Sequence, residues 1–233
     1  MHAVVTGGGS GVGRALAVRL AREGWRVAVL GRRRAALEET ATLAGTEVVR
    51  AEPCDVTDAD AVARVSDRLL ADWHDTVDVV VCAAGTNIAA RGLDRLTTRD
   101  FDDLVATNLL GAFHVTHAFL PAMRRRGRGT VVTIASDAGL LASAKAGAGY
   151  VASKFGLVGL TDTINAELRG EGIRACVICP GDIDTPLLER RPVPPDAAAR
   201  AVMLQPDDVV ECVMLAITLP DRAIVERLVV RPR

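Results

Sequence analysis

The chain has 233 residues, 49% of them hydrophobic, so it can bury a sizeable core, and its length predicts one domain. Its 28 basic and 29 acidic residues give a formal net charge of -1, and the arginines are interleaved with acidic residues. This balance argues against a nucleic acid or an anionic membrane as partner and favours a small-molecule ligand.

The cysteine content and the lengths of the apolar runs indicate the cellular compartment of the protein. Five cysteines, an odd number in a chain large enough to be stable without disulfides, favour reduced thiols. The amino-terminal residues enter a strand-like run directly, and no later apolar run approaches membrane-spanning length. We therefore expect a cytoplasmic protein without a membrane partner.

Short β-branched runs alternate with longer amphipathic segments, which is typical of strand–helix–strand units on a parallel sheet. The predicted strands are His2–Thr6, Arg26–Leu30, Glu47–Ala51, Val77–Cys82, Thr130–Ala135, Arg174–Ile178 and Ile224–Val230. The predicted helices are Val12–Glu23, Ala35–Leu43, Asp58–Asp72, an interrupted stretch from Asp100 to Arg126, Tyr150–Arg169 and Asp207–Leu219. With right-handed crossovers, these units predict one α/β domain over residues 1–233, a doubly wound parallel sheet that binds ligands where its strands end.

Helix ends have their own sequence signals. Thr57 and Thr98 precede helices as expected N-caps, and Gly24, Gly127 and Gly170 stand where helices are expected to stop. Prolines make the stretch 186–200 the least regular part of the chain, and too little chain follows it for it to link two domains.

The first predicted strand runs into a glycine-rich turn and then a helix. Glycines there bring backbone N–H groups and a helix N-terminus close to a pyrophosphate, so the turn predicts a dinucleotide site. The alternative is an ordinary glycine-rich turn. The expected contacts are Gly7, Gly9, Ser10, Gly11 and Val12.

The end of the second predicted strand carries arginines where a carboxylate would bind the ribose hydroxyls of NAD(H). Arg32 and Arg33 lie there, and no acidic residue occurs between Arg26 and Leu37. Because guanidinium groups bind phosphate through charge-assisted hydrogen bonds, this favours NADP(H). The alternative is a solvated helix start.

Tyr150 and Lys154 are four residues apart, hence on one face of a helix. A nearby ammonium favours the phenolate, so we expect Lys154 to lower the pKa of Tyr150 enough for proton exchange at neutral pH. Ser136 ends the fifth predicted strand on the same rim of the sheet.

Together these motifs resemble the short-chain dehydrogenases/reductases over nearly the whole chain. The matching residues are Thr6 to Gly13, Asp55, Val56, Ala84, Gly85, Asn108, Ser136, Tyr150, Lys154, Pro180 and Gly181. The resemblance implies a Rossmann-type sheet of seven strands, a catalytic tetrad of Asn108, Ser136, Tyr150 and Lys154, and a homodimer or homotetramer.

The resemblance also implies residue roles. Ser136 would bind the substrate oxygen, Tyr150 would exchange its proton, Lys154 would bind the nicotinamide ribose, and Asn108 would hold a water in a proton relay. Asp55 and Val56 would contact the adenine. The remaining expected cofactor contacts are Ala83, Ala84, Gly85, Tyr150, Pro180, Gly181, Ile183 and Thr185.

The chain departs from the family pattern at two places. Cys82 and Ala83 stand where asparagine usually braces the central strands, so we expect altered hydrogen bonding in that turn. Ser136 precedes Tyr150 by one residue more than is usual, and that spacing alone points to Asp137. We prefer Ser136, because its flanking residues match the family and a carboxylate would oppose developing negative charge.

No metal site is expected. Cys176 and Cys179 would point to opposite faces of a strand, so we interpret them as buried core thiols. His114 and His117 have helical spacing but no third ligand near them in sequence, and we interpret them as interface or surface residues.

The sequence thus predicts an NADPH-dependent oxidoreductase that interconverts a carbonyl and a secondary alcohol. The alternative is a catalytically idle NADP(H)-binding regulatory or structural protein. A substrate lid is expected at 186–205, where Glu189, Arg190 and Arg191 are interpreted as solvated rather than as contacts for an acidic substrate.

Overall fold

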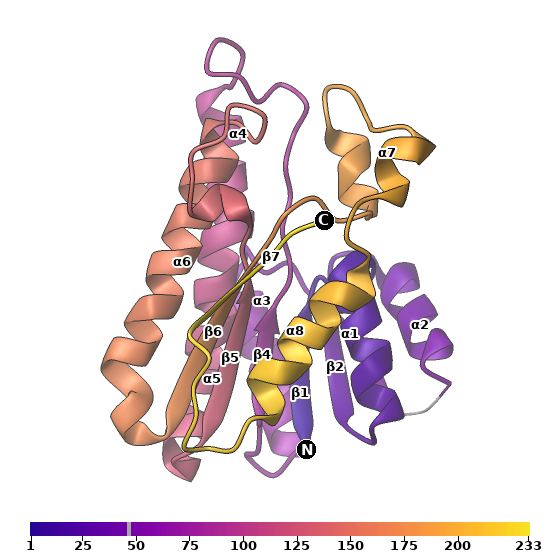
Figure 1. Ribbon diagram of the computed structural model, residues 1–233. Coiled ribbons are helices and arrows are strands. Elements are labelled where there is room, and N and C mark those ends of the chain that lie inside the picture. Colours follow the sequence, from indigo (N-terminus) through magenta and orange to yellow (C-terminus); the bar gives the residue numbers. More distant parts are fainter. Residues whose placement is uncertain (46–47) are drawn as a thin grey trace.

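The computed structural model describes residues 1–45 and 48–233 and, within them, shows one seven-stranded parallel sheet of order β3-β2-β1-β4-β5-β6-β7 (Figure 1). The strands are β1 (His2–Thr6), β2 (Arg26–Gly31), β3 (Val49–Pro53), β4 (Val79–Cys82), β5 (Gly129–Ile134), β6 (Ile173–Pro180) and β7 (Arg227–Val230). The helices are α1 (Gly11–Arg22), α2 (Arg34–Leu43), α3 (Ala59–Asp72), α4 (Thr98–Val105), α5 (Gly111–Arg126), α6 (Ala148–Leu168), α7 (Ala197–Ala201) and α8 (Pro206–Thr218). The predicted Rossmann-type single domain is confirmed.

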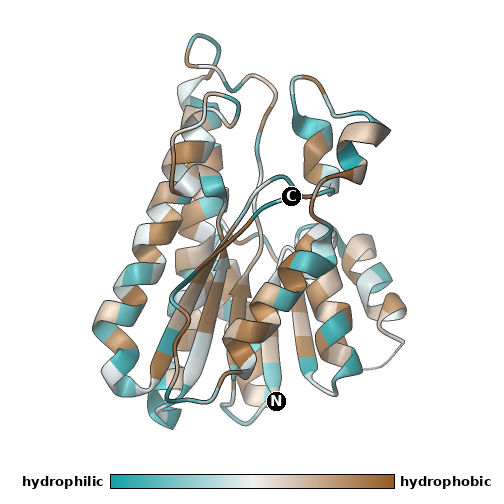
Figure 2. Ribbon diagram, in the orientation of Figure 1, coloured by the Kyte–Doolittle hydropathy of each residue, from teal (hydrophilic) through white to brown (hydrophobic). Residues whose placement is uncertain are grey.

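Two hydrophobic cores, one on each face of the sheet, hold this arrangement together. Because side chains alternate along a strand, Val4 packs into the core beneath α3, α5 and α6, whereas Ala3 and Val5 pack beneath α1, α2 and α8. The five inner strands, β1, β2, β4, β5 and β6, are therefore buried on both faces and are almost unbroken hydrophobic runs, as Figure 2 shows at the centre of the molecule, whereas the edge strands β3 and β7 are partly exposed.

The strand order reverses beside β1, and this reversal positions the site. The chain builds β2 and β3 on one side of β1 and then returns to place β4 on the other side. The connections after β1 and β4 consequently leave the sheet in opposite directions. The crevice between them, at the carboxyl ends of the strands, is where doubly wound folds bind ligands.

Several predicted boundaries are wrong by a few residues. The predicted start of the third strand, Glu47, lies outside the described residues, and β3 extends to Pro53. The N-cap of α3 is Asp58 rather than Thr57, because the Asp58 carboxylate accepts a hydrogen bond from the Ala61 N–H group at 2.9 Å. In the same way Thr97, not Thr98, caps α4, since its hydroxyl accepts from the Asp100 N–H group.

The structure also shows where the predicted helices end and what interrupts the fourth one. Gly24 and Gly127 have left-handed φ angles of 82° and 62° and end their helices as predicted. After α6 the chain makes a 3₁₀ turn instead of stopping at Gly170, and the left-handed residue is Gly172 (φ 78°). Between α4 and α5 lies a π-helical turn, Ala106–Leu110.

The lengths and hydropathies of the helices bear on membrane insertion. Over residues 1–45 and 48–233, none of the helices combines the length and the apolar character that crossing a membrane requires.

Candidate active site

The glycine-rich turn between β1 and α1 packs closely against the turn after β4. Gly7 has a left-handed φ of 68°, and a Cβ atom there would lie 2.8 Å from the Ala83 carbonyl oxygen. A Cβ atom on Gly13 would lie 2.5 Å from the Gly7 carbonyl oxygen. Only glycine fits at these two positions, so the sequence of the turn is explained by its close backbone packing.

Side chains hold the carbonyl groups of this turn. Arg14 Nη2 donates to the Gly9 carbonyl at 2.7 Å, and Thr40 Oγ1 donates to the Gly8 carbonyl at 2.7 Å. Ser10 is the N-cap residue of α1, but its side chain forms no capping hydrogen bond. The start of α1 and the Ser10 hydroxyl therefore suit a phosphate group, which helix N-termini favour.

Arginines follow β2 next to this turn. Arg32 and Arg33 are both exposed, and Arg33 is the N-cap residue of α2. Arg34 lies 3.7 Å from Glu38, whereas neither Arg32 nor Arg33 forms an ion pair with any residue of 1–45 or 48–233. Cations at a helix N-terminus are mildly unfavourable, so these two guanidinium groups suit an anionic ligand.

The turn after β4 is braced despite its missing asparagine. The Ala84 N–H group donates to Thr6 Oγ1 at 3.0 Å, and the Thr86 N–H group donates to Asn108 Oδ1 at 2.7 Å. Asn108 Nδ2 in turn donates to the Thr86 carbonyl at 3.0 Å. Thr6 and Asn108 thus form hydrogen bonds to the turn in which the family's usual asparagine is missing.

Tyr150 lies in the first turn of α6, and Ser136 follows β5 beside it. Burial raises the pKa of Tyr150 to about 12, although a hydrogen bond with the Ser136 hydroxyl opposes the rise. The net shift is opposite to the one that we expected, because the cost of removing a phenolate from water outweighs the lowering of the pKa by Ser136, Arg91 and Arg191. The Tyr150 hydroxyl is therefore protonated at neutral pH.

Lys154 lies one helical turn beyond Tyr150 and is 4% exposed. Its Nζ atom donates to the Ile134 carbonyl at 2.8 Å and lies 5.5 Å from the centroid of the Tyr150 ring, so the two side chains share one face of α6. Burial lowers the pKa of Lys154 to about 8, which leaves it mostly charged at pH 7. A Cβ atom on Gly85 would lie 3.5 Å from both Lys154 Nζ and Asn108 Oδ1, so these groups are neighbours.

Asn108 is fully buried in the π-helical turn. Its Nδ2 atom also donates to Ser153 Oγ at 3.0 Å, and Ser153 Oγ donates to the Tyr150 carbonyl at 2.8 Å. This chain of hydrogen bonds joins the π-helical turn to the helix that carries Tyr150 and Lys154. All four residues of the expected tetrad are therefore brought together.

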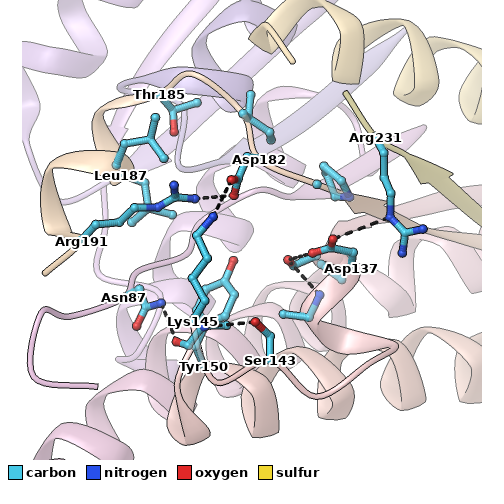
Figure 3. A pocket seen from close by; sticks show the side chains of 18 of the residues that line it. Asn87, Asp137, Ser143, Lys145, Tyr150, Asp182, Thr185, Leu187, Arg191 and Arg231 are labelled. Atoms are coloured by element: carbon cyan, nitrogen blue, oxygen red, sulfur yellow. Dashed lines mark hydrogen bonds and ion pairs between the residues drawn. The ribbon is translucent and has the colours of Figure 1, made fainter. Parts of the chain in front are cut away.

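Ser136 and Tyr150 line a cavity of about 410 Å³, together with residues of the segment from Pro180 to Thr185. Figure 3 shows Tyr150 and Thr185 on opposite sides of it. A Cβ atom on Gly11 would lie 3.2 Å from the Thr185 methyl group, so the cavity adjoins the glycine-rich turn. A dinucleotide held at the turn could thus extend into the cavity.

Comparisons with known proteins identify the family of this chain. The family model for short chain dehydrogenases matches residues 1–193. This chain belongs to the short-chain dehydrogenase family. It is 40% identical to a (3R)-3-hydroxyacyl-CoA dehydrogenase of Canis lupus familiaris over 200 residues, which are 82% of this chain and 76% of that protein.

Two solved structures are similar over almost their whole length. One is an alcohol dehydrogenase from the archaeon Thermococcus sibiricus complexed with 5-hydroxy-NADP, with a TM-score of 0.87, 31% identity and coverage of 99% of this chain and 96% of that one. The other is a serine dehydrogenase complexed with NADP+ in its closed form, with a TM-score of 0.91, 28% identity and coverage of 100% and 95%. Short-chain dehydrogenases are oxidoreductases that use a nicotinamide cofactor, so this chain is one by class.

Other expected cofactor contacts of this short-chain dehydrogenase follow β3 and β6. Asp55 Oδ1 accepts hydrogen bonds from the N–H group and the hydroxyl of Thr57, at 3.0 Å and 2.8 Å. Val56 is buried against Gly111 of α5. Past β6, Gly181 donates its N–H group to the Val230 carbonyl at 2.8 Å, which holds the chain at the cavity rim.

The cysteines and histidines considered for metal binding are placed as follows. Cys176 packs in the core beneath α8 and Cys179 in the core beneath α6, on opposite faces of β6 as predicted. His114 Nδ1 bonds the Val56 carbonyl at 3.0 Å, and His117 packs against Phe113.

Sequence reasoning missed several polar residues of the cavity. They are Asn87, Arg91, Lys145, Asp182 and Arg231. No motif marks them, because they come from four separate segments that only the folded chain brings together. The interpretation of Arg191 as a solvated lid charge is wrong: its side chain is 17% exposed and forms an ion pair with Asp182, whereas Glu189 and Arg190 are exposed.

Proposed function

We propose that this protein is an NADPH-dependent reductase that interconverts a carbonyl and a secondary alcohol. The observation that carries the proposal is the meeting of Ser136 and Tyr150 at the wall of the cavity that adjoins the glycine-rich turn, with Lys154 Nζ 5.5 Å from the centroid of the Tyr150 ring. A hydroxyl donor, a protonated phenol and a buried ammonium next to a dinucleotide turn are the groups that such a reaction requires.

The residues present fit NADP(H). The glycine-rich turn and the start of α1, which has no side-chain cap, suit the pyrophosphate, and Arg32 and Arg33, which form no ion pair within residues 1–45 and 48–233, suit the 2′-phosphate. When bound, the cofactor supplies the hydride. The relatives that were solved with NADP forms support this preference.

The chain's own residues would then perform the proton chemistry. The Ser136 hydroxyl donates a hydrogen bond to the substrate oxygen, and Tyr150 donates its proton to that oxygen as the carbonyl is reduced. A Tyr150 hydroxyl that is protonated at neutral pH suits reduction, since the proton is already in place. Lys154 would bind the nicotinamide ribose through Nζ, and Asn108 would hold the water that returns a proton from solvent.

Asp137 is a poorer candidate for the substrate-oxygen contact than Ser136. Its carboxylate accepts the Ser136 hydroxyl at 3.1 Å and lies 3.7 Å from Arg231, so it is directed partly toward the carboxy-terminal segment. Ser136, in contrast, contacts Tyr150. The hydrogen bonds that Thr6 and Asn108 make to the turn after β4 also support an active protein over a catalytically idle one.

The segment 186–205 would act as the substrate lid. Its Leu187, Leu188 and Arg191 line the cavity. A β-bridge joins Ile183, just before the segment, to Leu204 near its end. The two ends of the segment therefore lie side by side, and the part between them can move as a unit.

A homodimer or homotetramer would cover an apolar surface near the site. Leu110, Phe113 and Phe155 are each 44% exposed, and they lie on the π-helical turn, α5 and α6. Burial of such side chains between subunits is favourable. All five cysteines are unpaired, which suits the cytoplasm.

The proposal is tested by following deuterium from the cofactor. Purified protein is incubated with NADPH deuterated at C4 of the nicotinamide and with a panel of ketones and aldehydes. We expect deuterium on the carbinol carbon of at least one product, detected by mass spectrometry, and no transfer in protein that has been heat-denatured. Tight NADPH binding without transfer to any member of a broad panel would instead favour the regulatory protein.

The cofactor preference gives a further prediction. Replacing Arg32 with aspartate places a like charge near the 2′-phosphate, so kcat/KM for NADPH should fall at least about 100-fold relative to that for NADH. The steady-state ratio measures this change. Arg34→Asp is the matched control, because Arg34 is paired with Glu38 in α2. An unchanged ratio in Arg32→Asp contradicts the assignment.

A further inference from the structure

The charged side chains of the cavity are unbalanced in favour of cations. Among the described residues, those that line it include four bases, Arg91, Lys145, Arg191 and Arg231, but only two carboxylates, Asp137 and Asp182. The wall of the cavity therefore carries an excess of two positive charges.

Asp182 forms ion pairs with two of the cations at once. Lys145 Nζ lies 2.9 Å from Asp182 Oδ2, and Arg191 contacts Asp182 Oδ1. Figure 3 shows both cations directed at this carboxylate. Since one carboxylate neutralises only one of two cations, this trio keeps a positive charge. Arg231 and Asp137, 3.7 Å apart, balance each other.

Arg91 supplies the second uncompensated charge, and its side chain is buried and held by hydrogen bonds to the backbone. Its side chain is 7% exposed, and its guanidinium donates only to backbone carbonyls, those of Ile88 (2.6 Å), Lys145 (3.3 Å) and Arg190 (2.7 Å). None of the acidic residues within 1–45 and 48–233 lies within ion-pair distance of it. Three of its five N–H groups are used, so one on Nη1 and one on Nη2 remain.

The position of Arg91 is fixed by close packing. Gly147, the N-cap residue of α6, has a positive φ of 84°, and a Cβ atom there would lie 2.6 Å from the Arg91 carbonyl oxygen and from Arg91 Cβ. Glycine at this position lets the Arg91 backbone lie against the start of the helix that carries Tyr150. The charge of Arg91 accordingly acts on the Tyr150 hydroxyl.

Burying a charged group without a counter-ion is costly, and it is retained where a ligand supplies the opposite charge. We propose that Arg91, with the Lys145–Asp182–Arg191 trio, binds the carboxylate of a small oxo acid or hydroxy acid beside Tyr150. The planar guanidinium fork matches a carboxylate, and its closeness to Tyr150 places that carboxylate near the reacting carbon. This inference rests on the proposed reductase function and names its substrate class.

The first test uses the wild-type protein with NADPH and pairs of oxo acids and their methyl esters, such as acetoacetate, 2-oxobutyrate and levulinate. Each pair presents the same carbonyl with and without the charge. We expect kcat/KM to be at least about 50-fold higher for the best acid than for its ester. Esters and neutral ketones that react as well as the acids would overturn the carboxylate site while leaving the reductase function intact.

The second test does not depend on turnover. Calorimetry with the protein saturated in NADP+ measures the binding of acetoacetate, which that form of the cofactor cannot reduce, against neutral methyl acetoacetate. We expect binding of the acid alone, and about 50-fold weaker binding in Arg91→Gln. Arg95→Gln is the matched control, since Arg95 lies in the same loop with a 68% exposed side chain outside the cavity. Equal binding of acid and ester contradicts the site.

Together the tests separate the two proposals. Carboxylate binding without deuterium transfer to any carbonyl would refute the reductase function but keep the anion site. Deuterium transfer without an acid preference would do the reverse. If Arg91→Gln does not fold, the acid and ester pairs with the wild-type protein decide the question without it.

Discussion

Replacing Tyr150 with phenylalanine is expected to lower kcat by about 1000-fold or more while leaving the Kd for NADPH within about threefold. General acid catalysis by a positioned side chain contributes about 10²–10⁴-fold, and Tyr150 is the only tyrosine in the chain. The hydroxyl is neutral in the folded protein, so its removal leaves no unpaired charge. Single-turnover oxidation of NADPH with the best substrate measures the effect.

Two controls make this result specific. Thr163→Ala removes a hydroxyl from an exposed position of the same helix, where it donates to the Gly159 carbonyl, and leaves the phenol in place, so its loss of activity should be far smaller than that of Tyr150→Phe. Unfolding curves and NADPH titrations should show that the phenylalanine variant is folded and binds cofactor. A Tyr150→Phe protein that keeps a tenth or more of the wild-type kcat would show that another group donates the proton.

The fold could be predicted from the sequence because its inner strands are buried on both faces. Parallel strands of this kind are short, nearly continuous β-branched runs, and the amphipathic helices between them repeat regularly. Element ends were less certain, since Thr57 and Asp58 are both good N-caps and only the hydrogen bond to Ala61 decides between them. The π-helical turn around Asn108 has no sequence signal, because one extra residue in a turn does not change the hydrophobic pattern visibly.

The candidate site was predictable where its residues lie close together along the chain. The spacing of Tyr150 and Lys154 places them on one helix face whatever surrounds them. Arg91 and the Arg190 carbonyl that it binds are 99 residues apart, so only the folded chain could show their contact. The direction of the Tyr150 pKa shift was also beyond the sequence, which reveals a neighbouring charge but not how completely the phenol is removed from water.

Replacing Lys154 with methionine is expected to stabilise the cofactor-free protein while lowering kcat by about 100-fold. Lys154 is buried, and its pKa is lowered to about 8 from its ordinary 10.5. Keeping that ammonium away from water therefore lowers the free energy of unfolding. Methionine has a similar length and no charge. Because the hydrogen bond to the Ile134 carbonyl is also lost, we expect a net gain of about 2 kcal/mol and a rise in Tm of about 6 °C at pH 7.

The pH dependence distinguishes this cause from a general improvement in packing. The unfolded chain binds the Lys154 proton more tightly than the folded protein does, so the wild type bears the full cost below about pH 8. Between pH 8 and 10.5 the folded lysine is neutral while the unfolded one is still charged, and the wild type gains stability relative to the variant. The difference in Tm should therefore be constant from pH 6 to 7.5 and shrink above pH 8. A difference that stays constant up to pH 10 would show that desolvation of the ammonium is not its origin, and a variant that is both inactive and less stable would show that Lys154 supports the fold as well as the reaction.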